Sequence, residues 1–213
     1  MTSVLNSNVI KNFLIILLPL VIILGNFRYL VFNFNFYNSL YEKSGVYQTF
    51  DKDLAKYETD NLFDYFRGQN NIDHNFFSNQ AITHLADVKD LIRFSTVLLY
   101  LALIAISALV TALAVKGKYK SIAQALFTSA LITLVFILLL ALGILKTFES
   151  LFTGFHQVLF TNNLWQFSQD DNLIKLFPQE FFIEFASRLS LNIIISSAII
   201  VLVSHIARRK ILK

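Results

Sequence analysis

The chain has 213 residues, of which 55% are hydrophobic and 15% are charged, and its formal net charge is +4. The apolar residues stand in long blocks, which is typical of a membrane protein and excludes an ordinary soluble domain. Cysteine is absent, which excludes thiolate nucleophiles, disulfides and cysteine-ligated metals.

Four apolar blocks are long enough to cross a bilayer core of about 30 Å, which needs roughly 20 helical residues. They cover about 9–31, 91–115, 121–145 and 189–207. The first block contains Pro19 and lacks a small-residue cleavage site, so we interpret it as a retained anchor and not as a secretory signal. The second and third blocks are separated by a five-residue loop, KGKYK, and are expected to be antiparallel neighbours.

The distribution of charge predicts the orientation in the membrane. All fourteen acidic residues fall in two segments, 32–90 and 146–188. The other polar segments contain no acid, and their basic residues are Lys11, Lys116, Lys118, Lys120, Arg208, Arg209, Lys210 and Lys213. The positive-inside rule therefore predicts cytoplasmic termini and two extracytoplasmic segments. Because the basic residues cluster at span ends and form no groove with aromatic residues, we expect no nucleic-acid partner.

Short amphipathic helices are expected in both extracytoplasmic segments, with their aromatic sides in lipid or against the helix bundle. Within 51–66 the residues at helical spacing are Leu54, Tyr57, Asn61, Leu62, Tyr65 and Phe66. A second stretch covers 149–160, and a third follows Pro178. No repeat or linker divides the chain. The predicted fold is an all-α integral membrane protein with four transmembrane helices, forming a single membrane domain over residues 1–213.

Two of the four histidines are candidates for chemistry. His74 lies in a polar run and is interpreted as solvated, and His205 lies among basic residues and is interpreted as a headgroup anchor. His84 and Asp87 are three residues apart on an expected helix, so that their side chains can form a hydrogen-bonded pair. Such a carboxylate raises the basicity of an imidazole, as a general base requires. His156 lies in the other extracytoplasmic segment at a comparable depth, so the two imidazoles can converge on one site.

Other interpretations of these residues stay open at this point. Lys89 and Arg93 lie one turn apart and can contact a phosphate or a developing oxyanion, but both are also typical of interfacial side chains that reach towards headgroups. His84, Asp87 and His156 are residue types that bind zinc. The HxxD spacing with a distant third ligand is a weak metal signal, and we predict no metal and no cofactor.

Three patches resemble a known family. In chain order they are HLADVK (84–89), GFHQVLF (154–160), and Trp165 followed by DNLIKLFPQEFF (171–182). They resemble the bacterial lipoprotein intramolecular transacylase family, Lit. The resemblance implies an acyltransferase of the bacterial cell membrane with its active site at the extracytoplasmic face. The family's paired histidines would correspond to His84 and His156.

The implied reaction is an acyl migration within one lipoprotein molecule. The sn-2 acyl chain of the diacylglyceryl-cysteine moves to the α-amine of the same cysteine and gives the lyso-form lipoprotein. The implied partners are the diacylglyceryl-modified lipoprotein N-terminus and membrane phospholipid. An α-amine with a pKa near 8 must lose a proton before it attacks an ester, and a histidine suits this task.

The residues receive the following roles as hypotheses. His84, oriented by Asp87, takes the amine proton, while His156 stabilises the oxyanion or protonates the leaving hydroxyl; the reverse assignment also stays open. Lys89 is a second oxyanion donor or the partner of Asp87 in a salt bridge. The residues expected to bind substrate are Arg93, Phe155, Phe160 and Trp165, with the aromatic ones lining the acyl-chain cavity.

Two other functions remain as alternatives. One is a zinc-dependent membrane hydrolase that uses His84, Asp87 and His156. The other is a non-enzymatic membrane accessory protein whose outer aromatic residues bind a partner. The spans contain few polar residues at depth, which argues against a transport pathway.

Overall fold

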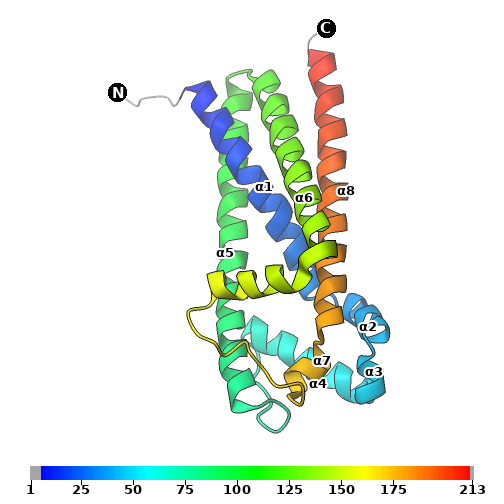
Figure 1. Cartoon of the computed structure of the whole chain (residues 1–213). Helices are drawn as coiled ribbons and strands as arrows, with labels where there is room; N and C mark the ends of the chain where they lie inside the picture. Colours follow the sequence, from blue (N-terminus) through cyan, green and yellow to red (C-terminus); the bar gives the residue numbers. More distant parts are fainter. Residues whose placement is uncertain (1–5, 212–213) are drawn as a thin grey trace. The chain divides into compact units, whose positions relative to one another are not determined.

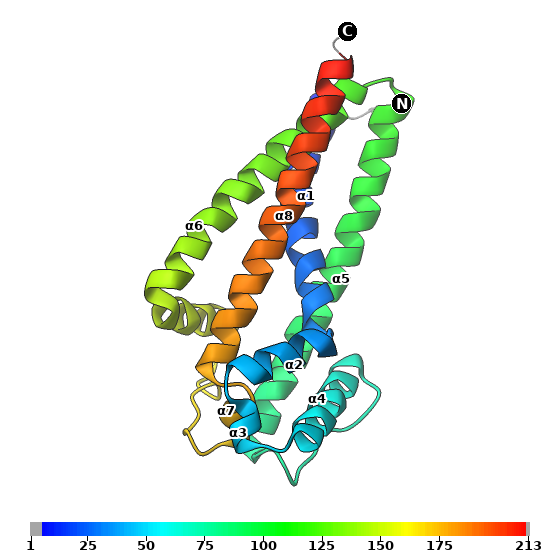
Figure 2. The same cartoon turned by 90° about the vertical axis from the view of Figure 1, so that its right-hand side faces the viewer.

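The computed structural model describes residues 6–211, with only the backbone at 144–146 and 211, and this described part contains helices and no strand (Figures 1 and 2). Four helices are long and apolar enough to cross a membrane: α1 (Ser7–Val31), α5 (Asn79–Val115), α6 (Tyr119–Leu159) and α8 (Gln179–Ile211). The shorter ones are α2 (Phe34–Lys43), α3 (Val46–Thr49), α4 (Lys52–Arg67) and α7 (Asn172–Leu176). The prediction of an all-helical membrane protein with four spans is confirmed.

Three of the long helices extend past the apolar blocks into the polar segments. α5 begins at Asn79, where the Ser78 hydroxyl accepts a hydrogen bond from the Ala81 N–H and so caps the helix. α8 begins at Gln179, directly after Pro178. The amphipathic stretch expected after Pro178 is therefore the first part of α8 and not a separate helix. The polar residues at the starts of α5 and α8, which the sequence assigned to separate extracytoplasmic segments, are thus continuous with the spanning helices.

α6 is interrupted by a kink at Thr147, whose backbone angles are φ −145° and ψ 41°. The apolar part of α6 is Tyr119–Gly143. We call residues 148–159 the arm; it is the yellow-green end of α6 in Figure 1. The arm coincides with the second predicted amphipathic stretch. It carries His156 on a side that is buried and Val158 on a side that is exposed.

The chain divides into two compact units, and the first contains Met1–Arg28, Thr96–Ala141 and Leu189–Lys213. Its apolar helices pack through two clusters. Ile22 of α1, Ile137 of α6 and Ile193 of α8 form one cluster, and Leu113 of α5 and Ala125 of α6 belong to the other. Between α5 and α6 the chain reverses at Gly117, whose positive φ of 67° favours glycine. The predicted antiparallel pair is therefore present.

The second unit contains Tyr29–Ser95 and Leu142–Arg188 and has an aromatic core. The ring of Tyr37 lies 4.9 Å from that of Phe63 and 5.2 Å from that of Phe181, which joins α2, α4 and α8. The buried hydroxyls of Tyr41 and Thr59 are hydrogen-bonded at 2.7 Å. The unit holds every residue predicted to bind substrate or take part in catalysis. That the whole chain forms one membrane domain stays a prediction.

The buried face of α4 includes only part of the apolar pattern expected over 51–66. Its buried residues are Ala55, Glu58, Thr59, Leu62 and Phe63. Leu54 is 41% exposed and Tyr57 is 60% exposed, so these two members of the pattern lie away from the buried face. The Thr59 side of α4 contacts α2 through the hydrogen bond between Tyr41 and Thr59 and through the packing of Phe63 on Tyr37. Tertiary packing here overrides the apolar periodicity of α4 alone.

Candidate active site

The two candidate histidines lie on different helices of the second unit and approach each other. His84 is in the polar first part of α5, ahead of the apolar block, and His156 is in the arm of α6; each side chain is buried. The centroids of their rings are 6.1 Å apart. The approach expected from the sequence is therefore observed. Their catalytic roles stay predictions.

Aromatic rings surround the two imidazoles. Phe160 contacts both, at 5.1 Å from the His84 ring and 5.6 Å from the His156 ring. Phe167 lies 5.6 Å from His84, and Trp165 lies 4.8 Å from His156. These aromatic rings exclude water from the imidazoles and lower the local dielectric constant. Electrostatic interactions with any polar group that enters the site are therefore stronger.

The protonation of His156 follows from its hydrogen bond. Nδ1 lies 2.7 Å from the backbone oxygen of Phe152, one turn earlier in the arm. A carbonyl oxygen only accepts hydrogen bonds, so Nδ1 carries a proton and donates it. In the neutral ring Nε2 is then unprotonated and holds its lone pair outward from this bond. His156 thus has the tautomer of a general base.

Burial keeps both imidazoles neutral. The pKa of His84, which lies outside the apolar block of α5, falls to about 4 because of burial and the nearby His156, although Asp87 opposes this. The pKa of His156 is also lowered by burial, against the effect of its bond to Phe152. At neutral pH both rings are therefore uncharged. An uncharged imidazole can accept a proton or donate its single N–H.

Asp87 does not make the expected hydrogen-bonded pair with His84. Its Oδ2 accepts a hydrogen bond of 2.9 Å from Nδ2 of Asn162. Nδ1 of His84 is buried and has no hydrogen-bond partner among the described residues. The three-residue spacing allows a common face, but the amide of Asn162 takes the carboxylate instead. Asp87 therefore holds the segment 160–167, and the tautomer of His84 is not set by it.

The segment 160–167 carries three of the rings around the imidazoles and is fixed by hydrogen bonds. The backbone oxygen of Asn162 accepts from Nε1 of Trp165 at 3.1 Å. Gln80 of α5 donates through Nε2 to the backbone oxygens of Leu164 and Gln166. Sequence reasoning missed Asn162, Gln80 and Phe167. None of them belongs to a periodic pattern or a motif that could have indicated a role.

Lys89 and Arg93 are not brought to the imidazoles by any described contact. The ammonium of Lys89 lies 3.9 Å from the centre of the Tyr65 ring on α4, a cation–π contact. Lys89 is five residues from His84, so it points to a different side of α5. Arg93 is exposed. Neither the oxyanion role of Lys89 nor its salt bridge with Asp87 has a contact to support it.

The predicted substrate-binding aromatics are placed differently from one another. Phe160 and Trp165 are partly buried and contact the imidazoles. Phe155 lies 5.4 Å from His156 and is 52% exposed, so it forms the outer border of the site. As for zinc, the described residues contain no group of three or more His, Cys, Asp or Glu arranged to hold a metal ion. The zinc hydrolase alternative thus lacks a ligand set there.

Four membrane-spanning helices and a buried pair of neutral imidazoles define a membrane-integral protein with a histidine-based site. Residues 12–182, most of the chain, match the model of the family described as lipoprotein intramolecular transacylase Lit. The chain belongs to this family. It is therefore an acyltransferase that acts on lipoproteins.

Solved structures share the fold. The membrane-integral lipoprotein intramolecular transacylase Lit from Bacillus cereus is 21% identical over 96% of both chains, with a TM-score of 0.84. Two further structures of that protein, with one histidine replaced by arginine or by alanine, match with TM-scores of 0.80 and 0.79 over 96% of this chain and 92% and 94% of theirs. No curated protein sequence matches. The structural likeness is strong in fold at low sequence identity.

Proposed function

We propose that the enzyme moves the sn-2 acyl chain of a diacylglyceryl-modified lipoprotein to the α-amine of the same N-terminal cysteine. Membership of the Lit family supports the reaction class. The observation that carries the assignment to this site is the pair of buried imidazoles at 6.1 Å, one of them with a tautomer suited to a base. The product is the lyso-form lipoprotein.

His156 is the general base in this proposal. The α-amine enters in its neutral form, after its ammonium proton has passed to solvent. Nε2 of His156 then accepts an N–H proton as the amine nitrogen attacks the sn-2 ester carbon, and the C–N bond forms while the carbonyl oxygen becomes an oxyanion. The imidazolium then donates the same proton to the sn-2 oxygen as the C–O bond breaks. Proton and charge balance within this one cycle, so no co-reactant is needed. The bond to Phe152 keeps Nδ1 protonated throughout.

His84 is the electrophilic partner. A neutral imidazole with a pKa near 4 is a weak base but still donates its N–H. In the desolvated site a hydrogen bond to the oxyanion is stronger than in water. Nδ1 of His84 has no hydrogen-bond partner among the described residues, so none of them engages this ring nitrogen. This is the reverse of the assignment favoured by the sequence alone, and the tautomer of His156 is the reason.

Orientation supplies much of the acceleration. Amine and ester belong to one molecule, so holding them together contributes on the order of 7 to 11 kcal/mol, and general base catalysis adds roughly 10² to 10⁴ in rate. No enzyme nucleophile is required, in agreement with a chain without cysteine. In this scheme Asp87 is a positioning residue, because it acts through Asn162 and the segment 160–167. The exposed ring of Phe155 offers an apolar path for the acyl chain.

The site belongs at the extracytoplasmic face of the bacterial cell membrane. The support is the distribution of charge, with all acidic residues in 32–90 and 146–188 and acid-free basic segments elsewhere. Both termini are then cytoplasmic, and α2, α3, α4 and α7 are extracytoplasmic helices. The ester and amine of a membrane-anchored lipoprotein lie at this same interface.

Replacement of each histidine tests the proposal. In a bacterial strain that displays only diacylglyceryl lipoproteins, His156→Ala and His84→Ala are expected to abolish lyso-form production, which mass spectrometry of the N-terminal lipopeptide detects. His74→Ala is the matched control, because His74 is exposed in the same unit. Wild-type yields of lyso-form from both variants, at equal protein levels, would refute histidine catalysis.

A further inference from the structure

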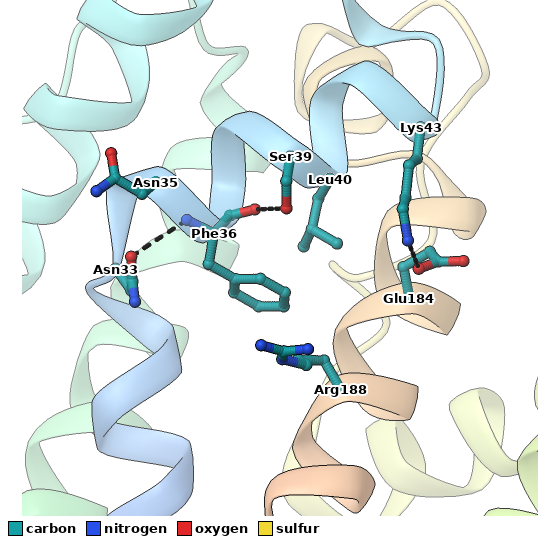
Figure 3. A pocket seen from close by; sticks show the side chains of 8 residues that line it. All are labelled: Asn33, Asn35, Phe36, Ser39, Leu40, Lys43, Glu184 and Arg188. Atoms are coloured by element: carbon teal, nitrogen blue, oxygen red, sulfur yellow. Dashed lines mark hydrogen bonds and ion pairs between the residues drawn. The ribbon is translucent and has the colours of Figure 1, made fainter.

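A polar cavity of about 320 Å³ lies in the second unit and shares no lining residue with the histidine site. Its walls come from α2 with the residue before it, and from the first part of α8 (Figure 3). The lining residues are Asn33, Asn35, Phe36, Ser39, Leu40, Lys43, Glu184 and Arg188. The volume greatly exceeds the roughly 30 Å³ that one water occupies in the liquid, so the cavity has room for a group of several heavy atoms.

The cavity is rich in hydrogen-bond donors. Oδ1 of Asn33 accepts the N–H of Phe36 at 3.1 Å, which leaves the amide nitrogen of Asn33 with donors to spare. Arg188 is exposed and makes no hydrogen bond or ion pair among the described residues, so none of these residues engages its five N–H donors. Figure 3 shows its guanidinium next to the Phe36 ring at the cavity. A donor-rich cavity favours an anionic ligand.

The charges lead to the same conclusion. Lys43 and Glu184 form an ion pair with Nζ and Oε2 2.9 Å apart, and these two charges offset each other. Arg188 lies one turn after Glu184 on α8 and adds a positive charge that no described acid balances. A planar guanidinium can form two parallel hydrogen bonds with a phosphate.

The position along the chain indicates the depth in the membrane. Asn33 follows the last residue of α1, Val31, where the first apolar block ends. Arg188 directly precedes the apolar block 189–207. Both ends belong to the same predicted side of the membrane, the extracytoplasmic one. Residues at the ends of spans lie at the level of lipid headgroups, where phosphate groups are concentrated.

We propose that this cavity binds the phosphate of a membrane phospholipid headgroup, with Arg188 as the main contact and with Asn33 and Lys43 as further donors. The diacylglyceryl anchor of the substrate contains no phosphate, so the bound lipid is a second molecule and not the reactant. The site goes beyond the proposed function and does not depend on it. A headgroup here contacts α2 and α8 at once, and binding therefore stabilises the folded second unit.

The test measures binding and not acyl transfer. The purified, delipidated full chain is titrated in detergent with dioleoyl phosphatidylglycerol, with phosphate-free dioleoylglycerol, and with inorganic phosphate, and bound ligand is counted by native mass spectrometry. Arg188→Gln removes the guanidinium, and Arg188→Lys keeps a positive charge but lacks the two parallel N–H donors of the guanidinium. Lys56→Gln is the matched control, since Lys56 is an exposed residue of α4 in the same unit and its replacement also removes a positive charge.

The wild-type chain is expected to bind the phospholipid and not dioleoylglycerol. Loss of a charge-assisted pair weakens binding about ten- to a hundredfold in Arg188→Gln. We expect an intermediate loss in Arg188→Lys and none in Lys56→Gln. Equal binding of both lipids, wild-type affinity in Arg188→Gln, or inorganic phosphate binding as tightly as the phospholipid would each overturn the proposal. If Arg188→Gln does not fold, Arg188→Lys and the dioleoylglycerol comparison still decide.

Discussion

Glu58 provides a stability test of the second unit. Its side chain is 2% exposed within α4, and its Oε2 is buried and has no hydrogen-bond partner among the described residues. Burial raises the pKa of this carboxyl from 4.5 to about 7, with a smaller contribution from the charge of Asp73. At about 1.4 kcal/mol for each unit of pKa, ionising Glu58 in the folded state costs about 3 kcal/mol more than in the unfolded chain.

The sign of the pH dependence follows from this raised pKa. The folded state binds the proton more tightly than the unfolded state, so stability is unaffected below pH 4.5, falls between pH 4.5 and 7, and stays reduced above pH 7. Glu58→Gln keeps the shape of the side chain but cannot ionise. The difference in unfolding free energy between the variant and wild type is therefore expected to shift by about 3 kcal/mol in favour of the variant as the pH rises from 4 to 8.

The assay is denaturant unfolding in detergent micelles, followed by the fluorescence of Trp165, the single tryptophan of the chain. Taking the difference between wild type and variant at each pH cancels the titration of all other groups. Glu42→Gln is the control, since Glu42 is an exposed glutamate whose contact with Lys52 is a surface ion pair. The reasoning is wrong if the difference in unfolding free energy between wild type and Glu58→Gln stays constant within about 0.5 kcal/mol from pH 4 to 8.

Three further outcomes are expected. The transacylation rate in proteoliposomes should fall towards acid pH with the slope expected when a single group, the substrate amine, is protonated, because burial lowers the pKa of His156 below 6.5. A steeper fall near pH 6.5, which would show that a second group is protonated there, would contradict this. Asp87→Ala should speed hydrogen exchange in 160–167 and lower the rate, since it removes a hydrogen bond worth about 1.5–3 kcal/mol to a charged acceptor; unchanged exchange would argue against a positioning role. Tyr41→Phe should cost about 1 kcal/mol in unfolding free energy through loss of the bond to Thr59, whereas Tyr57→Phe, at an exposed ring, should cost almost nothing.

Features that depend on length and composition are well predicted from the sequence. An apolar block of some 20 residues permits little except a spanning helix, because backbone polar groups in lipid must be satisfied within the segment. The four spans and the reversal at Gly117 follow from this rule. The helices nevertheless extend further than the apolar blocks, since polar residues such as those after Ser78 continue a helix as readily as apolar ones once it has begun.

The histidine site was predictable only in part. Both imidazoles could be selected because each lies at the predicted outer end of a span, and their approach was inferred from their equal predicted depth. The partner of Asp87 was not predictable, because Asn162 is 75 residues away and belongs to an irregular segment. The burial of Thr59 on α4 was likewise not predictable, because its hydrogen-bond partner Tyr41 lies on a separate helix.

The hydrogen bond between His156 and the carbonyl of Phe152 has a consequence for engineering and for reading related chains. The acceptor is main chain, so any residue at position 152 that preserves the helix supplies the same oxygen and selects the same ring nitrogen as proton donor. The protonation pattern of His156, the proposed base, is thus set by helical geometry and does not depend on the residue type at position 152. A search for a histidine hydrogen-bonded to a carboxylate would miss such a histidine. A search for a helical histidine whose Nδ1 donates to the backbone carbonyl four residues earlier would find it.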